Sequence, residues 1–316
     1  MKTVAILAII GVASLALFSL SSGVQSDTES QFQDFLSAYG RNYGSESEYQ
    51  TRLSVFAENL NTIERLNIEN PRATFAVNEF ADRTSEEMTL RRGFNGSDKT
   101  VKRAAYSADI TAKSSDWTKM WTSVKNQGQC GSCWAFSAAA AFEARYTLSK
   151  GGKVTEESYA EQELVDCEPQ SDGCEGGLMD FAFEYLQKKS FCTTAQYPYT
   201  AKDESCKDTK CAGGPTDKAF KDVPEGDENA LLTELANGPV AIAVDANTWS
   251  FYSGGVLDKC GEDLDHGVTL VQYNAEKGFA KIRNSWGGSW GEEGHILIAV
   301  GSNLCGYANA ASVPTF

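Results

Sequence analysis

The chain has 316 residues, of which 41% are hydrophobic and 22% are charged. This composition is typical of a globular protein and excludes wholesale disorder and collagen-like repeats. The formal net charge of −15 argues against a nucleic-acid-binding protein, because an acidic chain repels phosphate backbones and no local basic patch is evident. With two histidines, His266 and His295, the sequence also argues against a His-rich metal centre.

Residues 1–23 are expected to be a secretory signal peptide. Lys2 gives a positive end, the run from Val4 to Leu20 is almost entirely apolar, and small residues follow at positions 21–23. The alternative is a membrane anchor, but this run is short for a span and no later stretch is apolar enough. The pattern favours the secretory pathway and no stable membrane anchor.

The cysteines divide the chain in two. None of the nine precedes residue 130, and they lie at Cys130, Cys133, Cys167, Cys174, Cys192, Cys206, Cys211, Cys260 and Cys305. In a secreted protein this pattern predicts a disulfide framework after about residue 110. Because nine is an odd number, one thiol is left over, and it is either paired with another chain or reactive.

An amphipathic helix is predicted over residues 48–67. Its face combines polar and apolar side chains at steps of three and four residues, namely Glu48, Arg52, Phe56, Asn59, Ile63 and Asn67. Pro71 ends the pattern. Because a buried Glu or Arg needs a partner, we expect this face to pair its own polar groups and to dock on another part of the chain.

After residue 110, helical patterns precede strand patterns. Residues 135–148 are rich in alanine and predict a buried helix, and residues 181–186 predict a second one. After the break at Gly238-Pro239, apolar residues predict strands over 240–244, 268–273, 279–282 and 295–300. This order indicates an α+β fold, in which a cleft between the two halves is a common place for a functional site.

The chemistry is concentrated between Gln127 and Ser137. Taken alone, Cys130-x-x-Cys133 is consistent with a redox dithiol, half of a zinc site or two half-cystines. Cys133 is expected at the N-terminus of the alanine-rich helix, where the free N–H groups and the helix dipole favour a thiolate. A zinc site lacks a second Cys-x-x-Cys or a pair of histidines. Cys133 is therefore the candidate nucleophile.

A thiolate nucleophile needs a base that later protonates the leaving group. His266 lies in a glycine-flanked turn at the entry to a strand, whereas His295 lies inside a strand pattern and is more typical of a structural role. Asn284 can orient the imidazole, and Trp286 and Trp290 can shield that bond from water. The pattern predicts a Cys–His–Asn site for nucleophilic catalysis. The alternatives are a redox protein and a binding or structural protein without catalytic turnover.

The chain resembles the papain-like cysteine proteases of the cathepsin L type. Cys-Gly-Ser-Cys-Trp at residues 130–134 matches the family's signature, which is followed about 130–150 residues later by a His and an Asn. Here His266 and Asn284 follow Cys133 by 133 and 151 residues. The face over residues 48–67 matches the family's propeptide helix motif at all six positions. Further matches are Asn78, Phe80, Asp82 and residues 161–167, 173–180, 284–288 and 310–315.

The resemblance implies a precursor with a papain-like, two-lobed α+β fold. A helical lobe and an antiparallel, β-barrel-like lobe would flank the active-site cleft, and a helical inhibitory prodomain would precede them. The implied domains are a signal peptide at 1–23, a propeptide at 24–109 and a mature peptidase domain at 110–316, whose first residue is expected between 104 and 113.

The resemblance also implies partners and a destination. The partners are protein and peptide substrates and the chain's own propeptide as intramolecular inhibitor, with a monomeric enzyme and no cofactor. The destination is a lysosome- or vacuole-like compartment or the extracellular space. We hypothesise that acid weakens the prodomain by protonating carboxylates in its ion pairs, such as Glu48 with Arg52.

The resemblance assigns catalytic roles to four residues. Cys133 is the implied nucleophile, held as a thiolate beside an imidazolium at His266, which Asn284 orients. The Gln127 side-chain amide and the Cys133 backbone N–H are the implied oxyanion hole. The implied reaction is hydrolysis of peptide bonds through a thioester acyl-enzyme. The lack of further histidines for an occluding loop favours an endopeptidase.

The resemblance implies a substrate site as well. Gly176 and Gly177 would let an extended peptide lie against the backbone. The pocket for the second residue before the scissile bond, P2, is expected to be apolar, without an acid at its base, and to favour Leu, Phe or Val over a basic residue. Its lining and flanking residues are expected to be Leu178, Met179, Ala243, Leu264, Asp265, Gly267, Trp286, Trp290 and Ala310.

Disulfide pairing follows from the same resemblance. The family pattern implies three bridges, Cys130–Cys174, Cys167–Cys206 and Cys260–Cys305. Cys192 and Cys211 are then left and are expected to form a fourth, which departs from the common family set.

Overall fold

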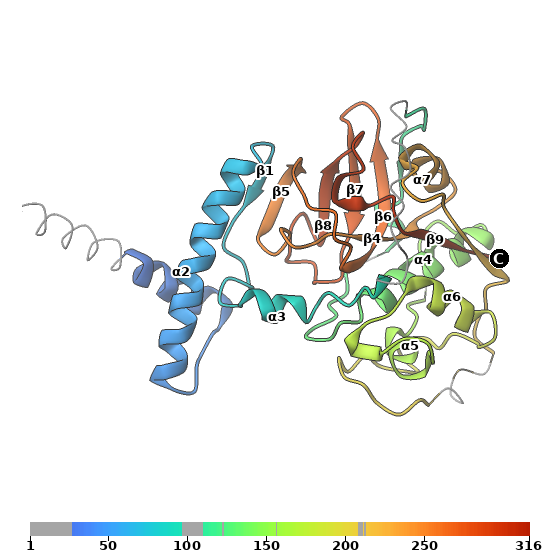
Figure 1. The fold of residues 1–316 in the computed structure, drawn as a ribbon. Coiled ribbons are helices and arrows are strands. Elements are labelled where there is room, and N and C mark those ends of the chain that lie inside the picture. The colour runs from blue at the N-terminus through green and yellow to red at the C-terminus, as the bar shows by residue number, and fades with distance from the viewer. Residues whose placement is uncertain (1–26, 97–109, 122, 156, 208–210, 212) are drawn as a thin grey trace, which may run out of the picture. The chain divides into compact units, whose positions relative to one another are not determined.

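The computed structural model describes residues 27–96, 110–121, 123–155, 157–207, 211 and 213–316 (Figure 1). The chain divides into two compact units, Met1–Glu64 with Val77–Arg83 and Arg65–Ala76 with Thr84–Phe316. The expected signal peptide at 1–23 and residues 104–109 of the expected mature start lie outside the described residues. In the part of the chain that is described, no helix is both long and apolar enough for a membrane span.

The first unit is built around aromatic contacts between two helices. A helix over residues 27–39 precedes α2 (Glu46–Glu69). The rings of Phe32 and Phe35 lie 5.2 and 5.3 Å from that of Phe56, and all three are buried. The helix predicted over residues 48–67 is thus confirmed, with two more residues at each end.

Two polar side chains of the predicted face of α2 bond backbone groups of another segment, so this face docks on another part of the chain as expected. Arg52 donates to the carbonyl of Asp82 at 2.9 Å, and Asn59 donates to the carbonyls of Ala81 and Arg83 at 2.9 Å each. Glu48, hypothesised to pair with Arg52, accepts a hydrogen bond from the Gly44 N–H at 3.0 Å. These bonds hold the 77–83 segment on the helix.

In the second unit, the end of α2 leads into the sheet. Asn67 bonds both the N–H and the carbonyl of Phe75 at 2.9 Å, which holds β1 (Ala73–Phe75) against the helix. β1 pairs antiparallel with β5 (Tyr252–Leu257). A short helix, α3 (Ser85–Thr89), follows and begins at a capping box formed by Thr84 and Glu87.

The central helix is α4 (Cys133–Ser149), which contains the four consecutive alanines 138–141. Alanine favours helix, and small side chains let α4 be buried on nearly all sides. It contacts α5 (Glu161–Cys167), α6 (Met179–Leu186) and strands of the sheet (Figure 1). The helices predicted at 135–148 and 181–186 are confirmed, while α5 and α7 (Glu228–Leu235) were not predicted.

The sheet has nine strands in the order β1-β5-β8-β7-β6-β4-β9-β3, with β2 also paired to β6. Neighbours are antiparallel except β5 and β8, which are parallel. The bounds not yet given are β2 Ser115–Asp116, β3 Ala219–Asp222, β4 Val240–Val244, β6 His266–Asn274, β7 Phe279–Arg283, β8 His295–Ala299 and β9 Ala311–Thr315. Among the described strands β1 and β3 end this order without pairing to each other, so the sheet is not closed. The helical and sheet parts otherwise agree with the α+β, papain-like fold that the resemblance implied.

Strand register and cross-links bring distant residues to one place. In the β4–β6 pair, Ala243 lies opposite Gly267 and Val244 opposite His266. The structure contains the four expected disulfides, which are Cys130–Cys174, Cys167–Cys206, Cys192–Cys211 and Cys260–Cys305. Cys133 is the cysteine that stays unpaired.

Candidate active site

Cys133 begins helix α4, as the sequence predicted, and is fully buried. Its Sγ accepts two backbone hydrogen bonds of 3.2 Å, from Gly267 of β6 and from Gly93. The first bond places the start of β6 against the thiol. The second comes from the crossing stretch, the name used below for residues 91–95, which passes over the thiol and covers it.

His266 begins β6 and is held by Asn284, whose Oδ1 lies 2.8 Å from Nε2 of the imidazole. The other ring nitrogen, Nδ1, is buried and has no hydrogen-bond partner among the described residues. The Trp286 ring lies 5.0 Å from the imidazole, and Trp290 packs on Trp286 at 5.1 Å. Both tryptophans are fully buried, so in this precursor they form the wall behind His266.

His295 has a different environment. Its Nδ1 lies 2.9 Å from the backbone carbonyl of Glu293, and its residue pairs with Arg283 inside the β7–β8 ladder. These contacts fit the structural role expected for His295.

Burial favours the neutral form of both titratable groups, Cys133 and His266. It raises the pKa of the Cys133 thiol to about 11, although the Gly267 and Gly93 N–H groups oppose this. It lowers the pKa of His266 to about 3. Burial therefore favours the neutral form of both groups at neutral pH, because desolvation disfavours each charged form. At His266 the charges of Arg91 and Arg92 in the crossing stretch act in the same direction.

Gln127 is fixed by three side-chain hydrogen bonds. Its Oε1 accepts from the Ser285 hydroxyl at 2.6 Å, and its Nε2 donates to the carbonyl of Cys130 at 2.9 Å. The second Nε2 hydrogen goes to the carbonyl of Arg91 at 2.8 Å. A peptide carbonyl of the crossing stretch therefore lies against the amide expected to bind the substrate oxyanion. Sequence reasoning missed Ser285, although it directly follows Asn284.

The crossing stretch pairs with Gly177 in strand-like fashion. The Gly177 N–H donates to the carbonyl of Gly93 at 2.9 Å, and the Asn95 N–H donates to the carbonyl of Gly177 at 3.2 Å. A Cβ on Gly93 would lie 1.8 Å from the carbonyl oxygen of Gly131. Only glycine fits this close approach. Gly176 has φ +126°, a backbone conformation that also favours glycine.

Phe94 of the crossing stretch enters the region where the P2 pocket was expected. Phe94 belongs to one buried cluster with Met179 and Ala243, against which the partly buried Leu178, Leu264 and Ala310 pack. A cavity of about 370 Å³ lies beside Phe94, Leu178, Met179 and Ala310. Carboxylates that the sequence analysis did not place there also line it, those of Asp180, Asp222 and Glu225.

Asp265, the residue before His266, binds the crossing stretch through charge. Its Oδ2 lies 3.3 Å from Arg92, whose side chain is 5% exposed, and Arg92 also donates to Asn247 at 2.7 Å. The Asp265 carbonyl accepts from the Phe94 N–H at 3.1 Å. Burial raises the pKa of Asp265 to about 6, with Arg92 acting in the opposite sense. The sequence analysis missed Arg92 and Phe94, because nothing local marks them as cleft residues.

One cluster of possible metal ligands occurs among the described residues, Glu163 with Cys192 and Cys211. The two sulfurs are joined in a disulfide, so they cannot act as thiolate ligands. This cluster gives no support to a metal centre.

Comparison with known proteins places the chain in a family. Residues 111–315 match the papain family cysteine protease model, and residues 32–88 match the cathepsin propeptide inhibitor domain. Cathepsin L 1 of Paramecium tetraurelia is 40% identical over 298 residues, which cover 91% of this chain and 93% of that protein.

Solved structures agree. Digestive procathepsin L 3 from the larval midgut of Tenebrio molitor has a TM-score of 0.77 and 33% identity, covering 92% of this chain and 99% of that one. The recombinant stem bromelain precursor has a TM-score of 0.79 and 31% identity, with the same two coverages. The protein is thus a cysteine endopeptidase that carries an inhibitor domain. The chain belongs to the papain family and is cathepsin L-like.

Proposed function

We propose that the mature enzyme cleaves peptide bonds by attack of a Cys133 thiolate on the scissile carbonyl. Gln127 Nε2 and the Cys133 N–H hold the oxygen of the tetrahedral intermediate. His266 gives its proton to the leaving amine, and a thioester remains on Cys133. Water, deprotonated by His266, then attacks the thioester and releases the acid, which restores the Cys133 thiolate beside a His266 imidazolium.

The observation that carries this proposal is the peptide backbone already lying in the site. A carbonyl of Arg91 accepts from Gln127, and the next residues pass directly over the Cys133 thiol. The Asn284 bond to His266 Nε2 leaves Nδ1 as the nitrogen for proton transfer. A backbone can therefore occupy the position that the mechanism requires of a substrate.

The covered site also supports a zymogen. Burial under the crossing stretch favours a neutral thiol and a neutral imidazole. Removal of this stretch exposes both groups to water, which lowers the cost of charge and lets a thiolate–imidazolium pair form. Latency in the precursor therefore has two parts, a blocked cleft and an uncharged dyad.

We assign the chain a signal peptide at 1–23, a propeptide at 24–109 and a monomeric mature enzyme at 110–316. The apolar N-terminal run and the four disulfides support the secretory pathway, with a lysosome- or vacuole-like or extracellular destination.

The P2 preference is for bulky apolar residues. Phe94, an aromatic residue of the chain itself, shares a buried cluster with Met179, against which Leu178 and Ala310 pack. A substrate Phe or Leu can make the same contacts. Discrimination among apolar residues is modest, since one methylene in such a pocket is worth about 1–3 kcal/mol.

The test is activation of the full-length precursor with a mild thiol at about pH 5. At this pH, carboxylates of the propeptide begin to protonate. Hydrolysis of a fluorogenic peptide with Phe or Leu at P2 is expected to appear as the propeptide is lost. Cys133→Ala is the control and is expected to be inactive. Processed, folded protein that neither cleaves the peptide nor reacts with iodoacetamide would overturn the proposal and favour an inactive scaffold.

A further inference from the structure

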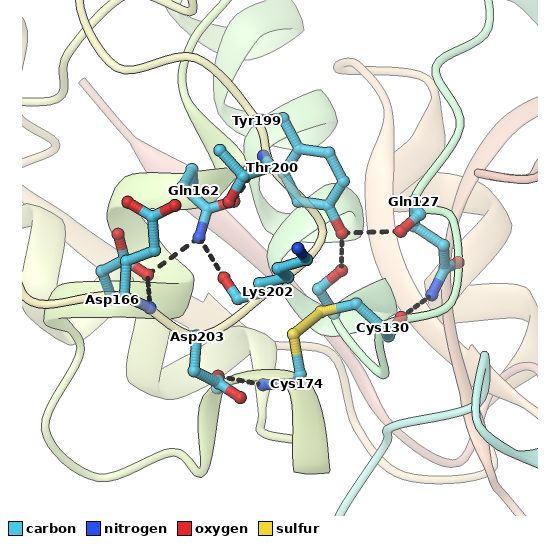
Figure 2. Close-up of a disulfide and its surroundings, with 12 residues drawn as sticks. Gln127, Cys130, Gln162, Asp166, Cys174, Tyr199, Thr200, Lys202 and Asp203 are labelled. Atoms are coloured by element: carbon cyan, nitrogen blue, oxygen red, sulfur yellow. Dashed lines mark hydrogen bonds between the residues drawn. A yellow bond between two sulfur atoms is a disulfide. The ribbon is translucent and has the colours of Figure 1, made fainter.

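The hydroxyl of Tyr199 lies between two parts of the oxyanion hole. It donates to the backbone carbonyl of Gln127 at 2.7 Å (Figure 2), and its oxygen lies 2.6 Å from the hydroxyl of Ser132. A carbonyl can only accept, so the single Tyr199 proton goes to Gln127. Ser132 must then donate to Tyr199, which makes a chain of two hydrogen bonds.

This chain joins the two oxyanion donors. One donor is the side-chain amide of Gln127, and Tyr199 fixes the backbone carbonyl of that residue. The other is the N–H of Cys133, which belongs to the peptide group that joins Ser132 to Cys133. One hydroxyl therefore sets the separation of two donors that must converge on one oxygen, a geometry on which oxyanion stabilisation depends.

Ser132 stands at the N-cap of α4, where a serine side chain usually accepts from the helix backbone. Here Ser132 makes no side-chain cap hydrogen bond, and it is fully buried. Its hydroxyl is used by Tyr199 instead. The Tyr199 ring also packs edge-on against Phe136 of α4 at 4.9 Å, so the helix that carries Cys133 holds Tyr199 twice.

The segment that carries Tyr199 is itself anchored, as Figure 2 shows. Gln162 of α5 accepts from the Thr200 N–H at 2.8 Å and donates to the carbonyl of Lys202 at 2.7 Å. Asp203 accepts from the N–H of Cys174 at 2.7 Å, and Cys174 is bonded to Cys130 beside the oxyanion hole. These contacts fix Tyr199 relative to α5 and to the disulfide.

We infer that Tyr199 is a positioning residue of the oxyanion hole, which holds Gln127 and the Ser132–Cys133 peptide in register through its hydroxyl. Its role is indirect, because its hydroxyl bonds Gln127 and Ser132. The inference rests on the proposed function, since it concerns the stabilisation of a tetrahedral intermediate in that reaction.

Tyr199→Phe removes only the hydroxyl and tests this role. Loss of one oxyanion donor outright costs about 10²- to 10³-fold in kcat, so misplacement of the donors is expected to lower kcat about tenfold. KM for a peptide with Phe at P2 and the rate of Cys133 alkylation by iodoacetamide are expected to change less than about twofold, because alkylation uses the dyad but no oxyanion. Ser132→Ala is expected to lower kcat about threefold, since Tyr199 still holds Gln127.

Tyr197→Phe is the matched control. It removes another hydroxyl of the same segment, one that donates to Asp166 at 2.7 Å and not to the oxyanion hole. Its kcat is expected to match that of the wild type. A kcat of Tyr199→Phe equal to that of Tyr197→Phe, or a parallel loss of kcat and alkylation rate, would overturn the inference. Should Tyr199→Phe not fold, an unchanged kcat in Ser132→Ala would overturn it. A wild type that cleaves no peptide would refute the proposed function instead.

Discussion

The helical side and the sheet side of the active site bind the crossing stretch in different ways. On the helical side, Gln127 and Gly177 bond its backbone carbonyls. On the sheet side, Asp265 accepts one backbone N–H and also forms an ion pair with the side chain of Arg92. In these contacts the helical side thus binds backbone groups of the crossing stretch, whereas the sheet side also binds a charged side chain.

This difference separates two kinds of control. Backbone hydrogen bonds do not titrate, so the helical side holds the crossing stretch by shape at any pH. The ion pair on the sheet side needs an ionised Asp265, whose pKa is about 6, and so it responds to mild acid. The catalytic roles that we propose divide along the same line, with the nucleophile and oxyanion donors on one side and the base on the other.

The largest effect is expected from the base on the sheet side. His266→Ala leaves Cys133 without a proton acceptor and is expected to lower kcat about 10⁴-fold or more, as for loss of a triad member. The measurement is peptide hydrolysis by the activated enzyme. His295→Gln is the control, and because His295 bonds backbone carbonyls, its kcat is expected to stay near the wild-type value. Equal losses in both variants would contradict the separate roles.

A smaller effect is expected on the helical side. Gln127→Ala removes one oxyanion donor but leaves the Cys133 N–H and the dyad, so kcat is expected to fall about 10²- to 10³-fold. The alkylation rate of Cys133 distinguishes this from damage to the dyad and is expected to be unchanged. A parallel loss of alkylation would mean that Gln127 supports the thiolate itself.

The sequence predicted the two sides unequally. Local pattern indicated Cys133 on the helical side, at the start of the alanine-rich helix, whereas the role of Gln127 came from the family resemblance. His266 begins β6 and Asn284 follows β7, both far along the chain. They were candidates because the chain has two histidines, and family spacing then supported their pairing with Cys133. The packing of Trp286 and Trp290 behind His266, the Arg92–Asp265 pair and the acidic lining of the cavity depend on tertiary contacts, which no local pattern encodes. The strand order of the sheet was not predictable for the same reason.

Because the helical side holds the crossing stretch through its backbone, a substitution at Gly93 is expected to change the reactivity of Cys133 strongly. In Gly93→Ala the new Cβ would lie 1.8 Å from the Gly131 carbonyl oxygen, so the crossing stretch must leave its path. Cys133 in the unprocessed precursor at pH 7.5 is then expected to react with iodoacetamide about 100-fold faster than in the wild type, since a backbone clash of this kind costs several kcal/mol.

The matched control is Gly44→Ala, which changes another glycine of the N-terminal segment where a Cβ would meet only the end of the Glu48 side chain at 3.7 Å. Its reactivity is expected to equal that of the wild type. Unchanged reactivity of Cys133 in Gly93→Ala would show that protection of the thiol does not depend on this backbone path of the crossing stretch.

Charge control on the sheet side predicts a pH-dependent effect. Arg92 lowers the pKa of Asp265, opposing burial, so their attraction is present above about pH 6 and is lost as the pH falls through 6. Arg92→Gln is therefore expected to raise precursor alkylation about tenfold at pH 7.5, as for loss of a buried charge-assisted bond. At pH 4.5, where Asp265 is protonated, the variant and the wild type should converge. Arg65→Gln, which breaks an exposed ion pair with Glu69, is the control, and a constant difference across this range would contradict the argument.

The smallest effect is expected in the cavity beside Phe94, where β3 and the loop after it supply two of the three lining acids and α6 supplies the third, Asp180. Asp222 and Glu225 line this cavity together with apolar residues, so a P2 arginine can place its stem on Met179 and its guanidinium near these carboxylates. The double variant Asp222→Asn with Glu225→Gln is expected to lower kcat/KM for P2 Arg about threefold and to leave P2 Phe unchanged, because such partly exposed pairs contribute below about 1 kcal/mol. Glu276→Gln, in the turn between β6 and β7, controls for net charge. Equal losses of kcat/KM for both peptides would mean that the carboxylates shape the pocket and do not bind the charge of the substrate. Asp265 would then be the one acid on the sheet side for which binding of a positive charge is supported.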